Sequence, residues 1–229
     1  MIFSCQTSFE GLKVERLVQA HGAGVTDASF CAASFAAIRS EADLTSIPDD
    51  LHDVALRVAH AIGDVAAIND LVWSDGAGTA CCEALSKGAP VIADARMLAD
   101  GIIRSSLPAD NRVICTLGLG NVAGNAVRDH TTRSAAAVDL WESFLEGAVV
   151  VIGNAPTALF RLLENLAAGG PRPAAIIGMP VGYVGAAESK AALVAAAPTP
   201  FIALQGRRGG SAVAAATINA LTRNAGNTA

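Results

Sequence analysis

Residues 148–164 read AVVVIGNAPTALFRLLE, and this stretch decides the fold class. The apolar, β-branched run at 148–152 is typical of a buried parallel strand. A tight turn at 153–155 follows, and Pro156 suits the first position of the apolar helix that comes next. Strand, turn and helix together predict one unit of an α/β sheet, with the turn at the carboxyl end of the strand.

A second unit of the same kind lies at residues 174–190, AAIIGMPVGYVGAAESK. In both units a glycine-bearing loop joins a strand to the start of a helix, where unpaired N–H groups and a partial positive charge favour anions. Gly153, Asn154 and Gly185 are therefore candidate anion-binding positions. Glycines between a strand and a helix are as often needed only for the turn, and this alternative stays open.

The alternation of apolar runs and helical segments predicts a three-layer α/β/α fold with a mainly parallel, flavodoxin-like central sheet. We predict a single α/β domain over residues 29–229 and a weakly determined N-terminal extension over residues 1–28. The predicted strands are residues 70–73, 90–94, 112–117, 148–152, 174–177 and 201–205. The predicted helices are residues 48–62, 76–87, 132–145, 157–166, 186–196 and 210–223.

The composition excludes several classes of protein. Hydrophobic residues make up 52% of the chain, but every long uncharged stretch is shorter than the ~20 residues of a membrane span. A net charge of −5 gives no general attraction to nucleic acid or anionic membranes, so neither is a predicted partner. The N-terminus lacks a secretory signal pattern, and the cysteines form no CxxC pair. We therefore expect a cytoplasmic protein with reduced thiols and no metal site.

His60 is the candidate catalytic residue, and it lies on the predicted helix 48–62. On a helical wheel it shares one side with Asp53 and Arg57 and faces away from the core. The opposite, apolar stripe consists of Leu51, Val54, Ala55, Val58 and Ile62. A histidine on a polar helix face usually contacts only solvent, but its ordinary pKa near ~6.5 suits proton transfer if a ligand binds there.

The sequence resembles the precorrin-8X methylmutase family through short strings that occur in collinear order from Ser34 to the last helix. The strings are SF, IR and EADL within residues 34–44, RVAH from Arg57, GAP from Gly88 with Asp94, VICTL from Val113, TRSAAA from Thr132, GNAPTALF from Gly153, GAAESK from Gly185 and GRRGGSA from Gly206. That family, which includes cobalt-precorrin-8 methylmutases, rearranges a corrin precursor in cobalamin biosynthesis.

The resemblance implies an isomerase that needs no cofactor. In the family, a methyl group migrates from C11 to C12 of the macrocycle by a 1,5-sigmatropic shift, giving hydrogenobyrinate from precorrin-8X or the cobalt counterpart from cobalt-precorrin-8. His60 matches the family's catalytic histidine, and we expect it to hydrogen-bond to or protonate a macrocycle nitrogen. The resemblance and the high apolar content also favour a homodimer. Whether the substrate carries cobalt stays open.

A corrinoid carries several carboxylates around a flat apolar ring, so its site should combine arginines, helix N-termini and small residues. The residues that we expect to bind this substrate are Ser34, Arg39, Arg57, Asp94, Met97, Arg133, Ser134, Gly153, Asn154 and Gly185.

Simpler structural roles stay open for several of these residues. Arg57 could form an i,i+4 surface pair with Asp53, Ser34 could be a helix N-cap, and Asp94 could cap a helix. The basic turn at 207–210 is a weaker candidate, because an exposed arginine pair after a strand is common.

Two other functions also stay open. A nucleotide- or phosphate-binding α/β protein would use the same glycine loops, although no Walker sequence is present. A non-catalytic corrinoid-binding carrier would use the same site and would be little affected by substitution of His60, whereas an isomerase would lose turnover.

Overall fold

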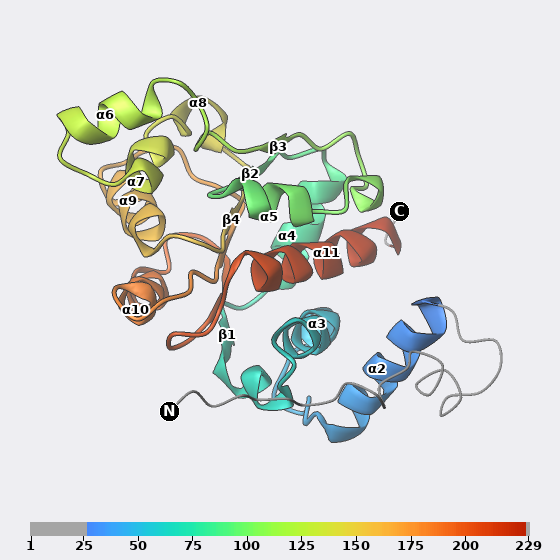
Figure 1. Ribbon diagram of the computed structural model, residues 1–229. Helices are drawn as coiled ribbons and strands as arrows, with labels where there is room; N and C mark the ends of the chain where they lie inside the picture. The colour runs from blue at the N-terminus through green and yellow to red at the C-terminus, as the bar shows by residue number, and fades with distance from the viewer. Residues whose placement is uncertain (1–26, 228–229) are drawn as a thin grey trace, which may run out of the picture.

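The computed structural model describes residues 27–227, in which a six-stranded sheet has helices on both faces (Figure 1). This confirms the predicted α/β/α architecture. The strands are β1 (Leu71–Trp73), β2 (Val91–Ala93), β3 (Val113–Ile114), β4 (Val149–Ile152), β5 (Ala175–Gly178) and β6 (Phe201–Leu204). The α-helices are α2 (Asp27–Glu41), α3 (His52–Ile62), α4 (Ala77–Ser86), α5 (Arg96–Gly101), α6 (Val122–Arg128), α7 (Arg133–Val138), α8 (Glu142–Leu145), α9 (Pro156–Ala167), α10 (Ala186–Ala196) and α11 (Ser211–Asn227). Short 3₁₀ helices are η1 (Asp49–Leu51), η2 (Val65–Asp70) and η3 (Arg104–Ser106).

The strand order is β1-β6-β5-β4-β2-β3, and all neighbours are parallel except β1, which runs antiparallel to β6. Without the antiparallel edge strand, the five parallel strands follow the flavodoxin order. The order reverses between β2 and β4, so the crevice where such sheets bind ligands lies beyond the carboxyl ends of these two strands.

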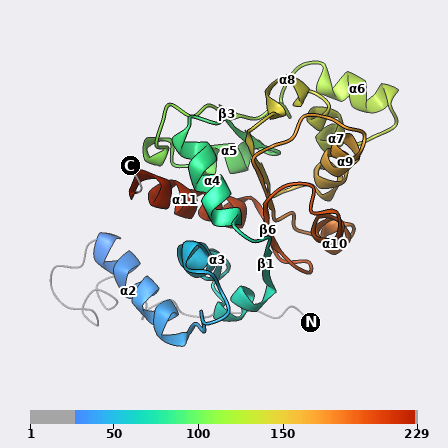
Figure 2. The ribbon, with the colours of Figure 1, turned by 180° about the vertical axis from the view of Figure 1, so that it is seen from behind.

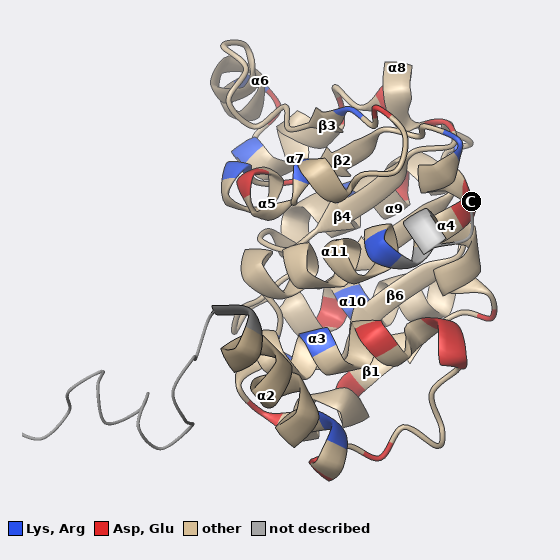
Figure 3. Ribbon diagram, turned by 90° about the vertical axis from the view of Figure 1, so that its right-hand side faces the viewer, with Lys and Arg blue, Asp and Glu red and all other residues tan. Residues whose placement is uncertain are grey.

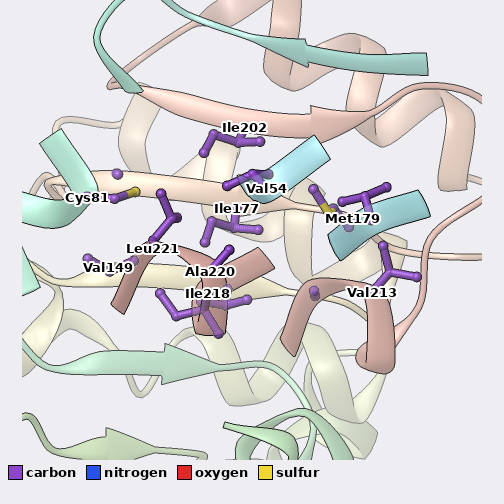
Figure 4. Close-up of a cluster of buried hydrophobic side chains, with 14 of the residues drawn as sticks. Val54, Cys81, Val149, Ile177, Met179, Ile202, Val213, Ile218, Ala220 and Leu221 are labelled. Atoms are coloured by element: carbon purple, nitrogen blue, oxygen red, sulfur yellow. The ribbon is translucent and has the colours of Figure 1, made fainter. Parts of the chain in front are cut away.

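Two hydrophobic cores hold the layers together, one on each face of the sheet. Along β4, Val149 and Val151 belong to the first core and Val150 and Ile152 to the second. This alternation follows from the two-residue period of a strand, and burial on both faces explains the unbroken apolar run. The first core is formed with α3, α4, α5 and α11 (Figure 4), and the second with α8, α9 and α10.

Two predicted elements differ from the observed ones. The helix predicted over 132–145 is divided into α7 and α8, because the buried Trp141 turns inward and its indole N–H donates to Thr116 Oγ1 at 2.9 Å. Thr116 Oγ1 in turn donates to the carbonyl of Ala137 at 2.8 Å. The strand predicted over 112–117 is observed only at β3, so Thr116 lies beyond its end.

Helix α2 was not predicted, and it packs on α3 outside the three layers (Figures 1 and 2). No α2 residue with a described side chain is buried. The predicted extension, residues 1–28, lies outside the described residues apart from its last two, and the single domain over 29–229 stays a prediction. None of the helices within residues 27–227 is long and apolar enough to cross a membrane.

Candidate active site

His60 is exposed on the last turn of α3, as the helical wheel predicts. Leu51, Val54 and Val58 on the opposite stripe are buried in the first core. The helix ends at Gly63, whose φ of 75° gives the left-handed cap that glycine adopts without strain. The core stripe therefore sets the rotation of α3 and directs the imidazole outward.

Phe35 of α2 is the residue that orients His60. Its ring stacks on the imidazole with centroids 4.9 Å apart and an interplanar angle of 22°. The Arg57 guanidinium lies over the same Phe35 ring, 5.3 Å from its centroid. Such aromatic contacts contribute roughly 0.5–1.5 kcal/mol each and restrict the side chains to few rotamers. Phe35 was missed as a site residue, although it directly follows Ser34 in the quoted SF string.

The arginines beside His60 are only partly neutralised. Burial lowers the pKa of Arg57, with a further contribution from the positive charge of Arg223 on α11. Figure 3 shows one basic segment on each of the neighbouring helices α3 and α11. Asp53 contacts Arg39 at 4.0 Å and forms no ion pair within that distance with Arg57, although its negative charge opposes the decrease in the pKa of Arg57. The positive charge of Arg57, three residues before His60, favours an anionic ligand on this part of α3.

Ser34 lies in the middle of α2, so the suggestion that it is an N-cap is wrong. Its position next to Phe35 places it on the helix that covers His60. The structure thus brings Ser34, Arg39, Arg57 and His60 onto one pair of packed helices.

Asp94 lies at the crevice between β2 and β4, and it is 3% exposed. Its Oδ1 accepts from the N–H of Gly153 at 3.0 Å, and its Oδ2 accepts from Asn154 at 3.0 Å and Ala155 at 2.8 Å. Burial raises the pKa of Asp94, and these three hydrogen bonds oppose the increase. Asp94 therefore binds the backbone of the loop that leads into α9, and it caps neither α5 nor α9 through a side-chain hydrogen bond to the helix.

Gly153 has a packing role at the same place. A Cβ atom there would lie 2.8 Å from the Cβ of Ala214 and 2.9 Å from the Cα of Ser211. The loop after β4 therefore packs directly on the first turns of α11, and only glycine allows this approach.

The other predicted substrate contacts lie at the starts of three further helices. Gly185 precedes α10 with a φ of 80° and packs on Pro156 of α9. Arg133 is exposed at the start of α7, whose N-cap is Thr132, and Ser134 is half-buried beside it. Met97 is 72% exposed in the first turn of α5. Within the described residues, no hydrogen bond, ion pair or ring contact joins these side chains to His60.

A cleft of about 530 Å³ begins one residue beyond His60. It is formed by Ala61 and Ile62 of α3, the loop after β5, the loop after β6, and the first turn of α11. The loops after β5 and β6 that line this cleft follow the carboxyl ends of two parallel strands, so the cleft lies at the carboxyl edge of the sheet. Among residues 27–227, no group of three or more histidine, cysteine or acidic side chains is arranged to hold a metal ion.

Fold and site together define a flavodoxin-like α/β protein with an oriented, exposed histidine beside a cleft at the carboxyl edge of its sheet. The family model described as precorrin-8X methylmutase matches residues 30–224. The chain therefore belongs to the precorrin-8X methylmutase family, whose members are isomerases that move a methyl group within one molecule.

Individual relatives agree with this assignment. A precorrin-8X methylmutase from Pseudomonas aeruginosa is 57% identical and covers 82% of this chain and 91% of its own. A cobalt-precorrin-8 methylmutase from Salmonella typhimurium is 40% identical, over 75% of this chain and 80% of its own. The solved structure of a precorrin-8X methylmutase from Thermus thermophilus is similar with a TM-score of 0.80 and 36% identity, covering 87% of this chain and 97% of that one.

Proposed function

We propose that this chain converts precorrin-8X to hydrogenobyrinate by moving a methyl group from C11 to C12 of the macrocycle. The observation that carries the proposal is the placement of His60, which is exposed, stacked on Phe35 at 4.9 Å and followed directly by Ala61, the first residue of the cleft. Family membership supplies the type of reaction, and this geometry supplies an acid–base group held in one orientation.

The proposed role of His60 is to donate a hydrogen bond or a proton to a macrocycle nitrogen. A concerted methyl shift needs no protein nucleophile, but its rate depends on which tautomer of the conjugated ring is present. An imidazole restrained by Phe35 loses little orientational freedom when it engages the nitrogen. Arg57, three residues earlier on the same helix, would bind a peripheral carboxylate and hold the ring over the imidazole.

We further propose that the natural substrate lacks cobalt. The support is the difference in identity between the two kinds of relative, 57% for the precorrin-8X enzyme and 40% for the cobalt-precorrin-8 enzyme. Both forms have the same peripheral carboxylates, so the preference would arise at the centre of the ring, facing His60.

An absorbance time course with precorrin-8X tests the proposal, because the methyl shift changes the conjugation of the macrocycle. We expect the wild type to convert the substrate and His60→Ala to bind it without conversion, with a loss of roughly 10²–10⁴-fold in kcat. His130→Ala is the matched control, since His130 is exposed on a loop outside the cleft.

Three outcomes would contradict parts of the proposal. Binding without conversion by the wild type would indicate a carrier. Conversion by His60→Ala at the wild-type rate would remove the histidine from the mechanism. Faster conversion of cobalt-precorrin-8 than of precorrin-8X would assign the cobalt-containing substrate.

A further inference from the structure

The loop between β6 and α11 contains two adjacent arginines with different environments, Arg207 and Arg208. The Arg208 guanidinium is paired with two carboxylates: its Nη1 donates to Asp64 Oδ2 at 2.8 Å and its Nη2 to Asp70 Oδ2 at 2.6 Å. Two carboxylates therefore neutralise Arg208 and tie it to η2. These two ion pairs give Arg208 a structural role, and both of its terminal nitrogens already have a carboxylate partner.

Lys190 of α10 holds the same loop through a hydrogen bond to its backbone. Its side chain is fully buried, and Nζ donates to the carbonyl of Arg208 at 2.6 Å. Burial lowers the pKa of Lys190 to about 8, an effect that the negative charge of Asp70 opposes. Burial of a lysine costs free energy of folding. Its hydrogen bond to the carbonyl of Arg208 offsets part of this cost and fixes the position of the loop.

Backbone hydrogen bonds complete the anchoring. The N–H of Gly182 donates to the carbonyl of Arg207 at 3.3 Å, and the N–H of Gly210 donates to the carbonyl of Met179 at 2.9 Å. Gly209 has a φ of 152°, and a Cβ there would clash with the carbonyl oxygens of Met179 and Pro180. The loop after β6 and the loop after β5 are thus held together as one unit, which lies between α10 and α3 (Figure 1).

Arg207 lies on this pair of loops, and its positive charge has no ion-pair partner among the described residues. Within residues 27–227 no carboxylate lies within 4.0 Å of its guanidinium. The group instead lies over the ring of Tyr183, 5.1 Å from the centroid, and this ring is 84% exposed. A guanidinium stacked on an aromatic ring keeps its N–H edge free for a bidentate carboxylate.

The surroundings of Arg207 match a carboxylate attached to an apolar body. Arg207 borders the 530 Å³ cleft that begins next to His60, and its other walls include Ala61, Val181 and Val213. Among the described residues that line this cleft, none is Asp or Glu. Since Asp64 and Asp70 neutralise Arg208, the net positive charge of the cleft comes from Arg207.

We propose that Arg207, held over Tyr183, is a substrate-recognition residue that binds one peripheral carboxylate of the corrinoid. The inference rests on the proposed function and adds a second carboxylate contact, at the cleft that begins at Ala61, whereas Arg57 precedes His60 on α3. A second contact of this kind adds binding free energy that is equal in the ground state and the transition state.

The test compares Arg207→Gln with Arg112→Gln, a matched control at an exposed arginine that precedes β3 at the other end of the sheet. We measure steady-state kinetics with precorrin-8X and binding of hydrogenobyrinate by absorbance titration. Loss of a charged hydrogen bond predicts a roughly tenfold to hundredfold increase in KM and in the product Kd for Arg207→Gln. Because the contact is made equally in ground and transition states, kcat should change by less than about twofold.

Two further variants separate recognition from folding. Arg207→Lys keeps the charge but loses the planar fork, and should bind hydrogenobyrinate with intermediate affinity. Tyr183→Phe keeps the aromatic ring and should resemble the wild type, whereas Tyr183→Ala should weaken binding.

Each contrary outcome is distinguishable. If the wild type turns over precorrin-8X and Arg207→Gln has the KM and Kd of Arg112→Gln, the role of Arg207 is refuted and the proposed function stands. If Arg207→Lys binds no better than Arg207→Gln, charge recognition is refuted. If the wild type binds no corrinoid, the proposed function and this inference both fail.

Discussion

Asp94 is buried at the crevice of the sheet, where it has a structural role and does not face a ligand. Its two oxygens accept three backbone hydrogen bonds from Gly153, Asn154 and Ala155. They link the end of β2 to the start of α9 across the point where the strand order reverses. The sequence predicts that a substrate carboxylate binds at the partial positive charge of this loop. In the structure the carboxylate of Asp94 occupies that position.

Substitution of Asp94 should therefore reduce stability. Asp94→Ala leaves the N–H groups of the loop before α9 without acceptors, and we expect a loss of about 1–3 kcal/mol in the free energy of unfolding. Asp94→Asn keeps one acceptor oxygen and should lose less. Urea denaturation monitored by circular dichroism provides the measurement, with Asp75→Ala as the control at an exposed acidic residue. Equal midpoints for Asp94→Ala and Asp75→Ala would refute this role.

At the scale of elements, α2 and α3 differ in how they are held although they carry the candidate site together. Helix α3 buries Val54, Val58 and their neighbours in the first core, whereas α2 has no buried residue among its described side chains. Contacts such as the Phe35–His60 stack and the 4.0 Å contact between Arg39 and Asp53 connect the two. Ile38 of α2 packs on the first core but stays partly exposed, so the position of α2 depends to a large extent on the side chains that we assign to the substrate site.

This difference predicts unequal hydrogen exchange in the two helices. Amides of α2 should exchange much faster than those of α3, because local opening of α2 exposes little apolar surface. Phe35→Ala should increase exchange in α2 further, while α3 stays protected. Mass-spectrometric hydrogen exchange measures both helices in one experiment, and equal protection of α2 and α3 would show that α2 belongs to the rigid core.

At the scale of the whole molecule, apolar side chains remain exposed away from the cleft. Val127 on α6 is 78% exposed, and Leu119 in the preceding loop is 51% exposed. Exposed apolar side chains of this kind are often covered by a second copy of the chain. We propose a homodimer, supported also by the high apolar content of the sequence.

Light scattering after size-exclusion chromatography checks the proposed dimer. The expected mass is twice the 23.1 kDa of one chain and should persist on dilution to micromolar concentration. A mass of one chain across that range would contradict the proposal. The roles proposed for His60 and Arg207 depend on contacts within one chain. A monomer would therefore not contradict them.

Much of the fold follows from local sequence patterns. The apolar run at 148–152 is buried on both faces as β4, and Pro156 begins α9. The stripe on α3 predicted an exposed His60, since the 3.6-residue period decides which side chains leave the core. Patterns of this kind are short-range, so they predict elements and the faces of elements.

The tertiary structure decided which side chains contact each other and which of them already have a hydrogen-bond or ion-pair partner within the protein. Asp94 reaches the amides of Gly153 and Asn154 some sixty residues away only because β2 and β4 are adjacent strands. Likewise, Arg208 and Arg207 are neighbours in sequence, but Asp64 and Asp70 bind the first while the second lies over Tyr183. The sequence by itself determined the α/β layers, the family and the exposed histidine, because these depend on local periodicity and ordered motifs. Only the tertiary structure separated the ligand-facing groups from those that are internally paired, because hydrogen bonds and ion pairs depend on distances that chain folding sets.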